Sequence, residues 1–153
     1  MEMAVELTFK FEDKSKETEL GTFFKNMGFE PVDKADIENI NQLHDSLVAL
    51  LPNHEKEILA FTKPDDFGYD VYDGLLDGIE YVYLQKAKCI INICGGSNSM
   101  EDTQRFMKFI KTIGGKPLTC KVQSDELEGI EAVKYTMDRN GNITENIVED
   151  SDW

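Results

Sequence analysis

The stretch Lys88–Val122 constrains the fold of this chain more than any other part of the sequence. Residues 89–94 read Cys-Ile-Ile-Asn-Ile-Cys, a short and largely β-branched apolar run that is followed by two glycines. Such a run predicts a strand that is covered on both faces. A helical pattern then begins at Ser99, and Leu118–Val122 has the composition of another strand. We therefore expect a strand, a helix and a second strand in succession.

The expected helix carries its own start and stop signals. Ser99 and Asp102 have the spacing of a capping box, and a Gly-Gly pair followed by Pro117 predicts the helix end. The Gly-Gly-Ser-Asn-Ser turn before the helix suggests a phosphate-binding loop, but Glu101 and Asp102 in the first turn would repel an anion. We therefore favour a plain connection between strand and helix. The apolar face of this helix comprises Thr103, Phe106, Met107, Ile110 and Ile113.

Periodicity and turn residues predict the remaining elements. Asp13–Lys16 is expected to be a turn, and Lys63–Gly68 a loop. Asn140-Gly141 is a strong signal for a hairpin turn. Two further helices are expected: Thr18–Met27, and a helix that is capped by Asp33 or Asp36 and reaches Leu51. The expected strands are Val5–Phe11, Glu57–Thr62, Tyr69–Leu76, Gly78–Leu84, Ile130–Met137 and Ile143–Val148.

These elements predict an α+β fold, with a mostly antiparallel sheet packed against about three helices and a C-terminal hairpin. Phe24–Val32 and Ile110–Leu118 weakly resemble each other, and each follows a strand and a helix. Two successive β–α–β halves of this kind are the plan of a ferredoxin-like sheet, which is the specific form we expect, with additions. We assign residues 1–149 to a single domain and residues 150–153 to a short acidic tail.

Charge and cysteine content limit the classes of partner. The chain of 153 residues has 30 acidic and 16 basic residues, a formal net charge of −14. This sign disfavours direct binding to nucleic acids or to anionic membranes, and it suits a basic protein partner. The sequence shows no signal peptide or membrane-spanning run, so we expect a cytoplasmic protein. Cys89, Cys94 and Cys120 lie in expected strands and have no metal-binding spacing, which indicates reduced core thiols.

The segment Asp65–Glu80 contains six acids and no base, with three aromatic residues among them. Taking Gly74 as the sixth position of an EF-hand loop places Tyr69 first, where an oxygen ligand is required, so this is not an EF-hand. The segment is either a solvated acidic face or a protein-binding surface, since aromatic residues set among charges suit an interface. The candidate contact residues are Asp65, Asp66, Tyr69, Asp70, Tyr72 and Asp73.

No catalytic residue, metal site or cofactor follows from the sequence. We expect a non-enzymatic acidic binding protein that acts on a basic protein partner. In size, acidity and lack of a catalytic motif, the chain resembles immunity and antitoxin proteins that inhibit nuclease-like toxins. One alternative is a small hydrolase that uses clustered carboxylates with a divalent metal, or a Cys94 nucleophile with His44 or His54 as its base. Another alternative is a small-molecule sensor domain, which would require a large apolar pocket with convergent polar groups.

Overall fold

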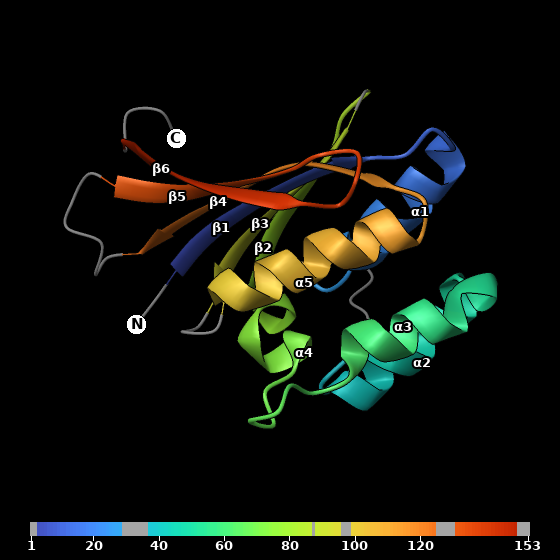
Figure 1. Cartoon of the computed structure of the whole chain (residues 1–153). Coiled ribbons are helices and arrows are strands. Elements are labelled where there is room, and N and C mark those ends of the chain that lie inside the picture. Colours follow the sequence, from blue (N-terminus) through green and yellow to red (C-terminus); the bar gives the residue numbers. More distant parts are fainter. Residues whose placement is uncertain (1–2, 29–36, 87, 96–98, 125–130, 150–153) are drawn as a thin grey trace.

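A single sheet of six strands organises the computed structural model, which describes residues 3–28, 37–86, 88–95, 99–124 and 131–149 (Figure 1). The strand order is β2-β3-β1-β4-β5-β6, and every neighbouring pair is antiparallel. The strands are β1 (Met3–Lys10), β2 (Ile79–Leu84), β3 (Cys89–Gly95), β4 (Lys116–Ser124), β5 (Glu131–Met137) and β6 (Ile143–Glu149).

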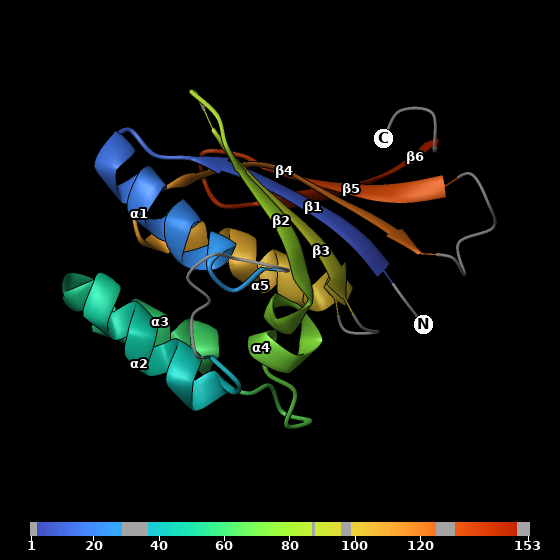
Figure 2. The same cartoon turned by 180° about the vertical axis from the view of Figure 1, so that it is seen from behind.

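Helices gather on one face of this sheet in two layers. Figures 1 and 2 show α1 and α5 lying against the sheet, α2 and α3 forming an outer layer, and α4 beside the start of β2. Short 3₁₀ segments cover Pro52–His54 and Leu76–Gly78. The helices are α1 (Lys14–Lys25), α2 (Ile40–Leu50), α3 (Glu55–Thr62), α4 (Val71–Gly74) and α5 (Ser99–Thr112).

The core lies between the sheet and the helices. Alternate residues of β1 point into it, and Phe9 packs against Phe106 of α5, whose ring also contacts Phe24 of α1 and Phe61 of α3. Each of these side chains is at least 96% buried. Burial of an aromatic side chain of this size stabilises the fold by about 1.5–3 kcal/mol. This aromatic cluster therefore joins both helical layers to the sheet.

The strand order confirms the α+β prediction and the mostly antiparallel sheet. β3 lies between β1 and β2, and β1 lies between β3 and β4, so two β–α–β units interlock. The ferredoxin-like form stays a prediction: this order is compatible with it, but further helices precede β2 and a hairpin extends the sheet beyond β4. The assignment of residues 1–149 to one domain also stays a prediction, and the tail 150–153 lies outside the described residues.

Several elements follow the sequence prediction closely. The predicted apolar face of α5 is buried, and β2 forms an antiparallel hairpin with β3. The predicted C-terminal hairpin forms from β5 and β6, with Met137 opposite Ile143. Strand β3 differs in one respect, because Cys89, Ile91 and Ile93 are buried while the alternate residues are only half-buried. The prediction that both faces of this strand are covered was wrong, since helices of the described residues pack on one face of the sheet.

Two predicted strands are helices. Glu55–Thr62 is α3, in which Ile58, Phe61 and Thr62 are buried at the i, i+3, i+4 spacing of a helix face. Val71–Gly74 is α4, and the segment therefore cannot pair as a strand. As a result, five helices are present among the described residues in place of the expected three. The six-residue segment before Lys63 was too short to distinguish a strand from a helix by periodicity.

Two helix starts also differ from their predictions. Asp13 caps α1 through hydrogen bonds from the backbone N–H groups of Ser15 (3.0 Å) and Lys16 (3.4 Å), so the predicted Asp13–Lys16 turn is the first turn of the helix. Asn39 caps α2 by accepting from the backbone N–H of Gln42 at 3.0 Å. The predicted caps Asp33 and Asp36 lie outside the described residues.

Candidate functional site

The predicted contact segment begins with a tight loop, Asp65–Tyr69. Oδ1 of Asp65 accepts hydrogen bonds from the backbone N–H groups of Phe67 and Tyr69, each at 2.9 Å. The N–H of Asp65 donates to the carbonyl of Tyr69 at 2.8 Å, and Gly68 adopts a φ of 86° that favours glycine. These bonds hold Asp66 and Phe67 at the loop tip. The side chain of Phe67 is 86% exposed, and that of Tyr69 is 53% exposed.

The next residues, around α4, divide into structural and exposed side chains. Asp70 is buried and caps α4 by accepting from the N–H of Asp73 at 2.9 Å. Tyr72 is half-buried, and its hydroxyl donates to the carbonyl of Ile37 at 2.9 Å. Asp66, Tyr69 and Asp73 are exposed. The structure therefore brings the six candidate residues together on one segment, while binding roles for them stay predictions.

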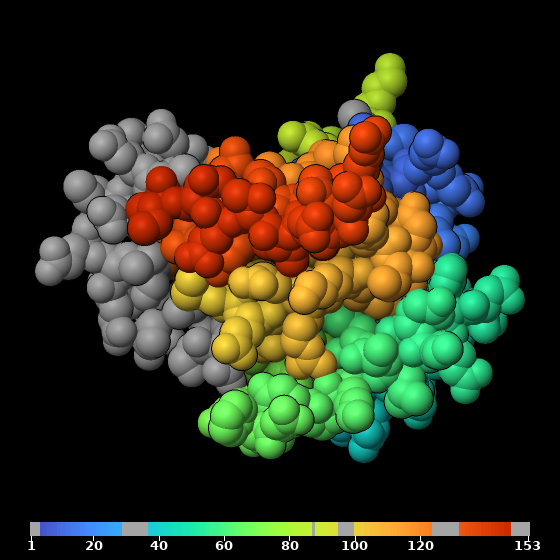
Figure 3. Space-filling view, viewed as in Figure 1, coloured from blue at the N-terminus to red at the C-terminus, as the bar shows by residue number. Residues whose placement is uncertain are grey.

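We define the acidic face as Asp65, Asp66, Phe67, Tyr69, Asp73 and Asp77, on the loop and around α4. Figure 3 shows this part of the chain in green at the lower edge of the molecule, next to α5.

Negative charges on this face repel one another. Burial, together with the nearby carboxylates of Asp73 and Asp70, raises the pKa of Asp77. Burial also raises the pKa of Tyr72, with further contributions from four neighbouring carboxylates. A cation placed among these groups would lower this repulsion. The face is therefore electrostatically suited to a positively charged surface.

Arg105 of α5 holds the end of α3, just before the loop. Its Nη2 donates to the carbonyl of Phe61 at 2.9 Å and to the carbonyl of Lys63. Its Nη1 lies 3.6 Å from Oδ1 of Asp102, a carboxylate that is 2% exposed. Burial raises the pKa of Asp102 to about 6, Arg105 opposes this rise, and the nearby charge of Asp65 adds to it. The charge of Asp65 on the acidic face therefore acts on Asp102 of α5.

The two histidines that the hydrolase alternative would use each contact another side chain. His44 Nδ1 is 3.0 Å from Oγ1 of Thr62, and His54 Nε2 is 3.0 Å from Nζ of Lys16. Burial raises the pKa of the Cys89 and Cys120 thiols to about 12, which keeps them protonated at neutral pH. Cys94 is half-buried. Within the described ranges, no three His, Cys, Asp or Glu side chains are grouped to hold a metal ion.

The candidate contacts predicted from the sequence omit Phe67, which is one of the three aromatic residues between Asp65 and Glu80. The signal that identifies it is the Asp-x-x-Gly spacing of Asp65 and Gly68, which places the intervening side chains at the tip of a closed loop.

Comparison with known proteins identifies no relative of this chain: no family, curated protein or solved structure matches it. None of the helices in the described part of the chain combines the length and the apolar composition that crossing a bilayer requires.

Proposed function

We propose that this chain is a non-enzymatic binding protein whose acidic face receives a basic protein partner. The observation that supports this most is the loop tip, where Phe67 is 86% exposed on a backbone held by the Asp65 carboxylate. Exposed aromatic side chains are frequent anchors in protein interfaces. Asp66 and Asp73 are exposed around it and would add long-range attraction to a cationic surface. An immunity or antitoxin-type inhibitor of a nuclease-like toxin is the specific form of this proposal.

The division between exposed and structural residues sharpens the predicted contacts. Asp66, Phe67, Tyr69 and Asp73 are free to meet a partner directly. Asp65, Asp70 and Tyr72 use their polar atoms within the chain and would act by holding the others in position. The hydrolase alternative stays a prediction.

Affinity capture from the native host tests the proposal. The test variant carries Asp66→Lys and Asp73→Lys, and its control carries Glu19→Lys and Glu145→Lys, which change the net charge equally at exposed positions outside the acidic face. We expect the wild type and the control to retain a common partner, and the test variant to bind it at least about 10-fold more weakly at low salt, since charge pairs are screened above about 0.1 M salt.

Phe67→Ala supplies a second readout that does not depend on charge. The exposed side chain contributes little to folding, so the free energy of unfolding should change by less than about 0.5 kcal/mol. Partner affinity should fall clearly. Equal capture by the wild type and both of these acidic-face variants, at low and at high salt, would rule out the acidic face as the binding surface.

A further inference from the structure

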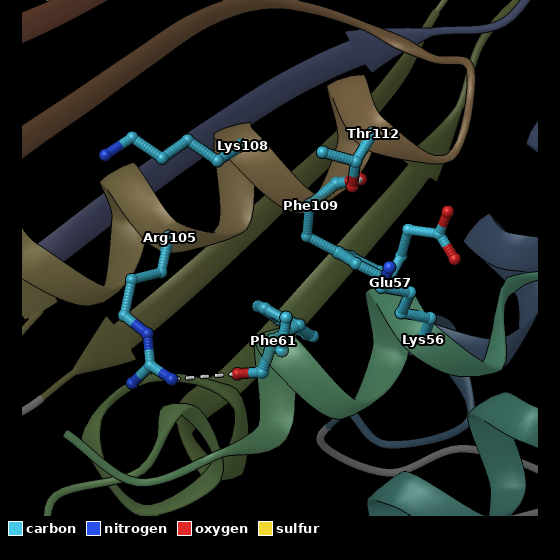
Figure 4. A pocket seen from close by; sticks show the side chains of 8 residues that line it. Lys56, Glu57, Phe61, Arg105, Lys108, Phe109 and Thr112 are labelled. Carbon is cyan, nitrogen blue, oxygen red and sulfur yellow. Dashed lines mark hydrogen bonds between the residues drawn. The ribbon is translucent and has the colours of Figure 1, made fainter.

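A groove of about 450 Å³ lies between α3 and α5, on the sheet-distal side of α5 (Figure 4). Its apolar floor consists of Phe61 and Phe109, whose rings stack in parallel with centroids 4.2 Å apart and an interplanar angle of 7°. Both residues are at least 96% buried, so the floor is fixed by packing. Ala60 contributes a small exposed side chain to the rim. The groove therefore has a preformed apolar floor made of two stacked aromatic rings.

The charge around this groove has the opposite sign to that of the protein. Three basic residues, Lys56, Arg105 and Lys108, line it with a single acid, Glu57, whereas the whole chain has 30 acids and 16 bases. Lys56 and Lys108 are exposed and form no ion pair within the described part of the chain. Arg105 is held by backbone carbonyls, and its guanidinium stays charged at any physiological pH.

The basic groups are not evenly spread along the groove. Figure 4 shows Arg105 and Lys108 on α5, away from Glu57 on α3, with the two basic side chains pointing in different directions. An anionic group is therefore most stable near Arg105 and Lys108, and an apolar body attached to it would extend along the phenylalanines. Pockets for small molecules have volumes of about 300–1,000 Å³, and this groove lies at the small end of that range.

We propose that this groove binds a small aromatic anion, with one or two rings against Phe61 and Phe109 and a carboxylate or phosphate near Arg105 and Lys108. The proposal does not depend on the acidic face. It supplies the apolar pocket with convergent polar groups that the small-molecule sensor alternative requires. The shape and the charge act together, because the ring alone lacks the ionic contact and the anion alone lacks the buried apolar area.

Titration of the ¹⁵N-labelled protein with 1-naphthoate tests this proposal. For a ligand of this size we expect a Kd of roughly 1 mM or tighter, with the saturable amide shifts concentrated on α3 and α5. The neutral analogue 1-naphthylmethanol should bind at least about 10-fold more weakly, since it lacks the charge that Arg105 and Lys108 recognise.

Two variants separate the contributions of charge and shape. Lys56→Gln with Lys108→Gln should weaken naphthoate binding about 10-fold and leave the alcohol within about twofold. The matched control, Lys25→Gln with Lys86→Gln, removes the same charge at exposed positions outside the groove and should leave both ligands within about twofold. Ala60→Trp should fill the groove and abolish binding of both ligands, while partner capture through the acidic face persists.

Three outcomes would overturn the proposal: no saturable shifts with millimolar naphthoate, shifts centred on other elements, or equal affinity for the acid and the alcohol. Binding of naphthoate that survives Ala60→Trp would place the site elsewhere and would also refute it. None of these outcomes bears on the acidic face, so the two proposals fail separately.

Discussion

Two loops of this protein, Asp65–Tyr69 and Asp138–Asn142, have the same backbone conformation and different surroundings. In each, the first aspartate accepts hydrogen bonds through Oδ1 from the N–H groups two and four residues later, at 2.8–2.9 Å. In each, the fourth residue is a glycine with φ near 86°, and its N–H donates to the aspartate carbonyl at 3.0 Å. The Asp-x-x-Gly spacing therefore produces one local structure twice.

The flanking elements differ completely. Asp138–Asn142 joins two paired strands, β5 and β6, whereas Asp65–Tyr69 connects two helices. The tip of the hairpin loop carries Arg139 and Asn140, and the other tip carries Asp66 and the exposed Phe67. The comparison shows that local hydrogen bonding sets the shape of a turn, while the neighbouring elements and the tip residues decide what the turn presents.

Basic side chains of α5 contact the hairpin loop and, ahead of the other loop, the end of α3. Lys111 donates to the carbonyl of Arg139 at 2.8 Å, in an exposed position. Arg105 donates to two carbonyls at the end of α3, just before the other loop, and pairs with the buried Asp102. The pKa of Asp138 is lowered, chiefly by the hydrogen bond from the N–H of Asn142. The two contacts are chemically similar, but one is exposed and the other partly buried.

The largest expected difference is in how much each of these two contacts contributes to the free energy of unfolding. Arg105→Met should lower the free energy of unfolding by about 3–5 kcal/mol at pH 8, because it leaves the buried carboxylate of Asp102 without its cation. Lys111→Met, the matched change at the hairpin, should cost less than about 1 kcal/mol because its contact is exposed to solvent. Urea denaturation of both variants measures this. Equal losses would mean that burial does not separate the two contacts.

The variant Asp102→Asn tests the buried contact of Arg105 through the pH dependence of the free energy of unfolding. The pKa of Asp102 in the folded chain is about 6, above its ordinary value of 3.8, so the folded state binds more protons than the unfolded chain between these values. The contribution of Asp102 to the free energy of unfolding is therefore largest below about pH 4 and is lost as the pH rises through about 6. A pKa difference of this size corresponds to about 3 kcal/mol.

We therefore expect Asp102→Asn to stabilise the protein by up to about 3 kcal/mol at pH 8 and to have little effect at pH 4. Denaturation midpoints measured at both pH values provide the check. Since Asp65 also raises this pKa and Arg105 lowers it, the variants Asp65→Asn and Arg105→Met should shift the pH profile in opposite directions. Identical profiles for the wild type and Asp102→Asn would contradict the assignment.

A smaller effect than that of Asp102→Asn is expected at a glycine that both loops share. Gly68→Ala and Gly141→Ala should each cost about 1–2 kcal/mol, because both residues adopt positive φ that an alanine reaches only with strain. A Cβ at Gly68 meets nothing within 4 Å, whereas one at Gly141 comes 3.1 Å from Cε of Lys111, a flexible atom that can move. Thermal unfolding would measure both costs. If Gly68→Ala were as stable as the wild type, this loop would not share the hairpin loop's conformation.

Much of the fold was predictable because its signals are local. Strand β1 alternates over its whole length, α5 has a complete apolar face, and the β5–β6 turn has its own glycine. Helix α3 was mispredicted because the packing of Phe61 against Phe106 and Phe109, which lie in a distant part of the chain, is not visible in the local sequence. Short segments do not contain enough residues for periodicity to oppose such a tertiary effect.

The candidate site was predictable in composition but not in roles. The sequence showed that carboxylates and aromatic residues alternate after Lys63, and no local pattern distinguished Asp70, a buried helix cap, from Asp66 at an exposed tip. The groove could not be predicted because it lies between α3 and α5, and the Arg105–Phe61 bond spans 44 positions. Such a site exists only once both helices are packed.

The sequence by itself determined the α+β class, the excess negative charge and the conformation of the two Asp-x-x-Gly loops, since these depend on residue type and on neighbours within a few positions. Tertiary structure alone decided which carboxylates are exposed, that two predicted strands contain helices, and that three basic residues line one aromatic groove. The physical reason is that burial and electrostatic environment are set by contacts between residues far apart in the chain, where the free energy of packing exceeds local conformational preference.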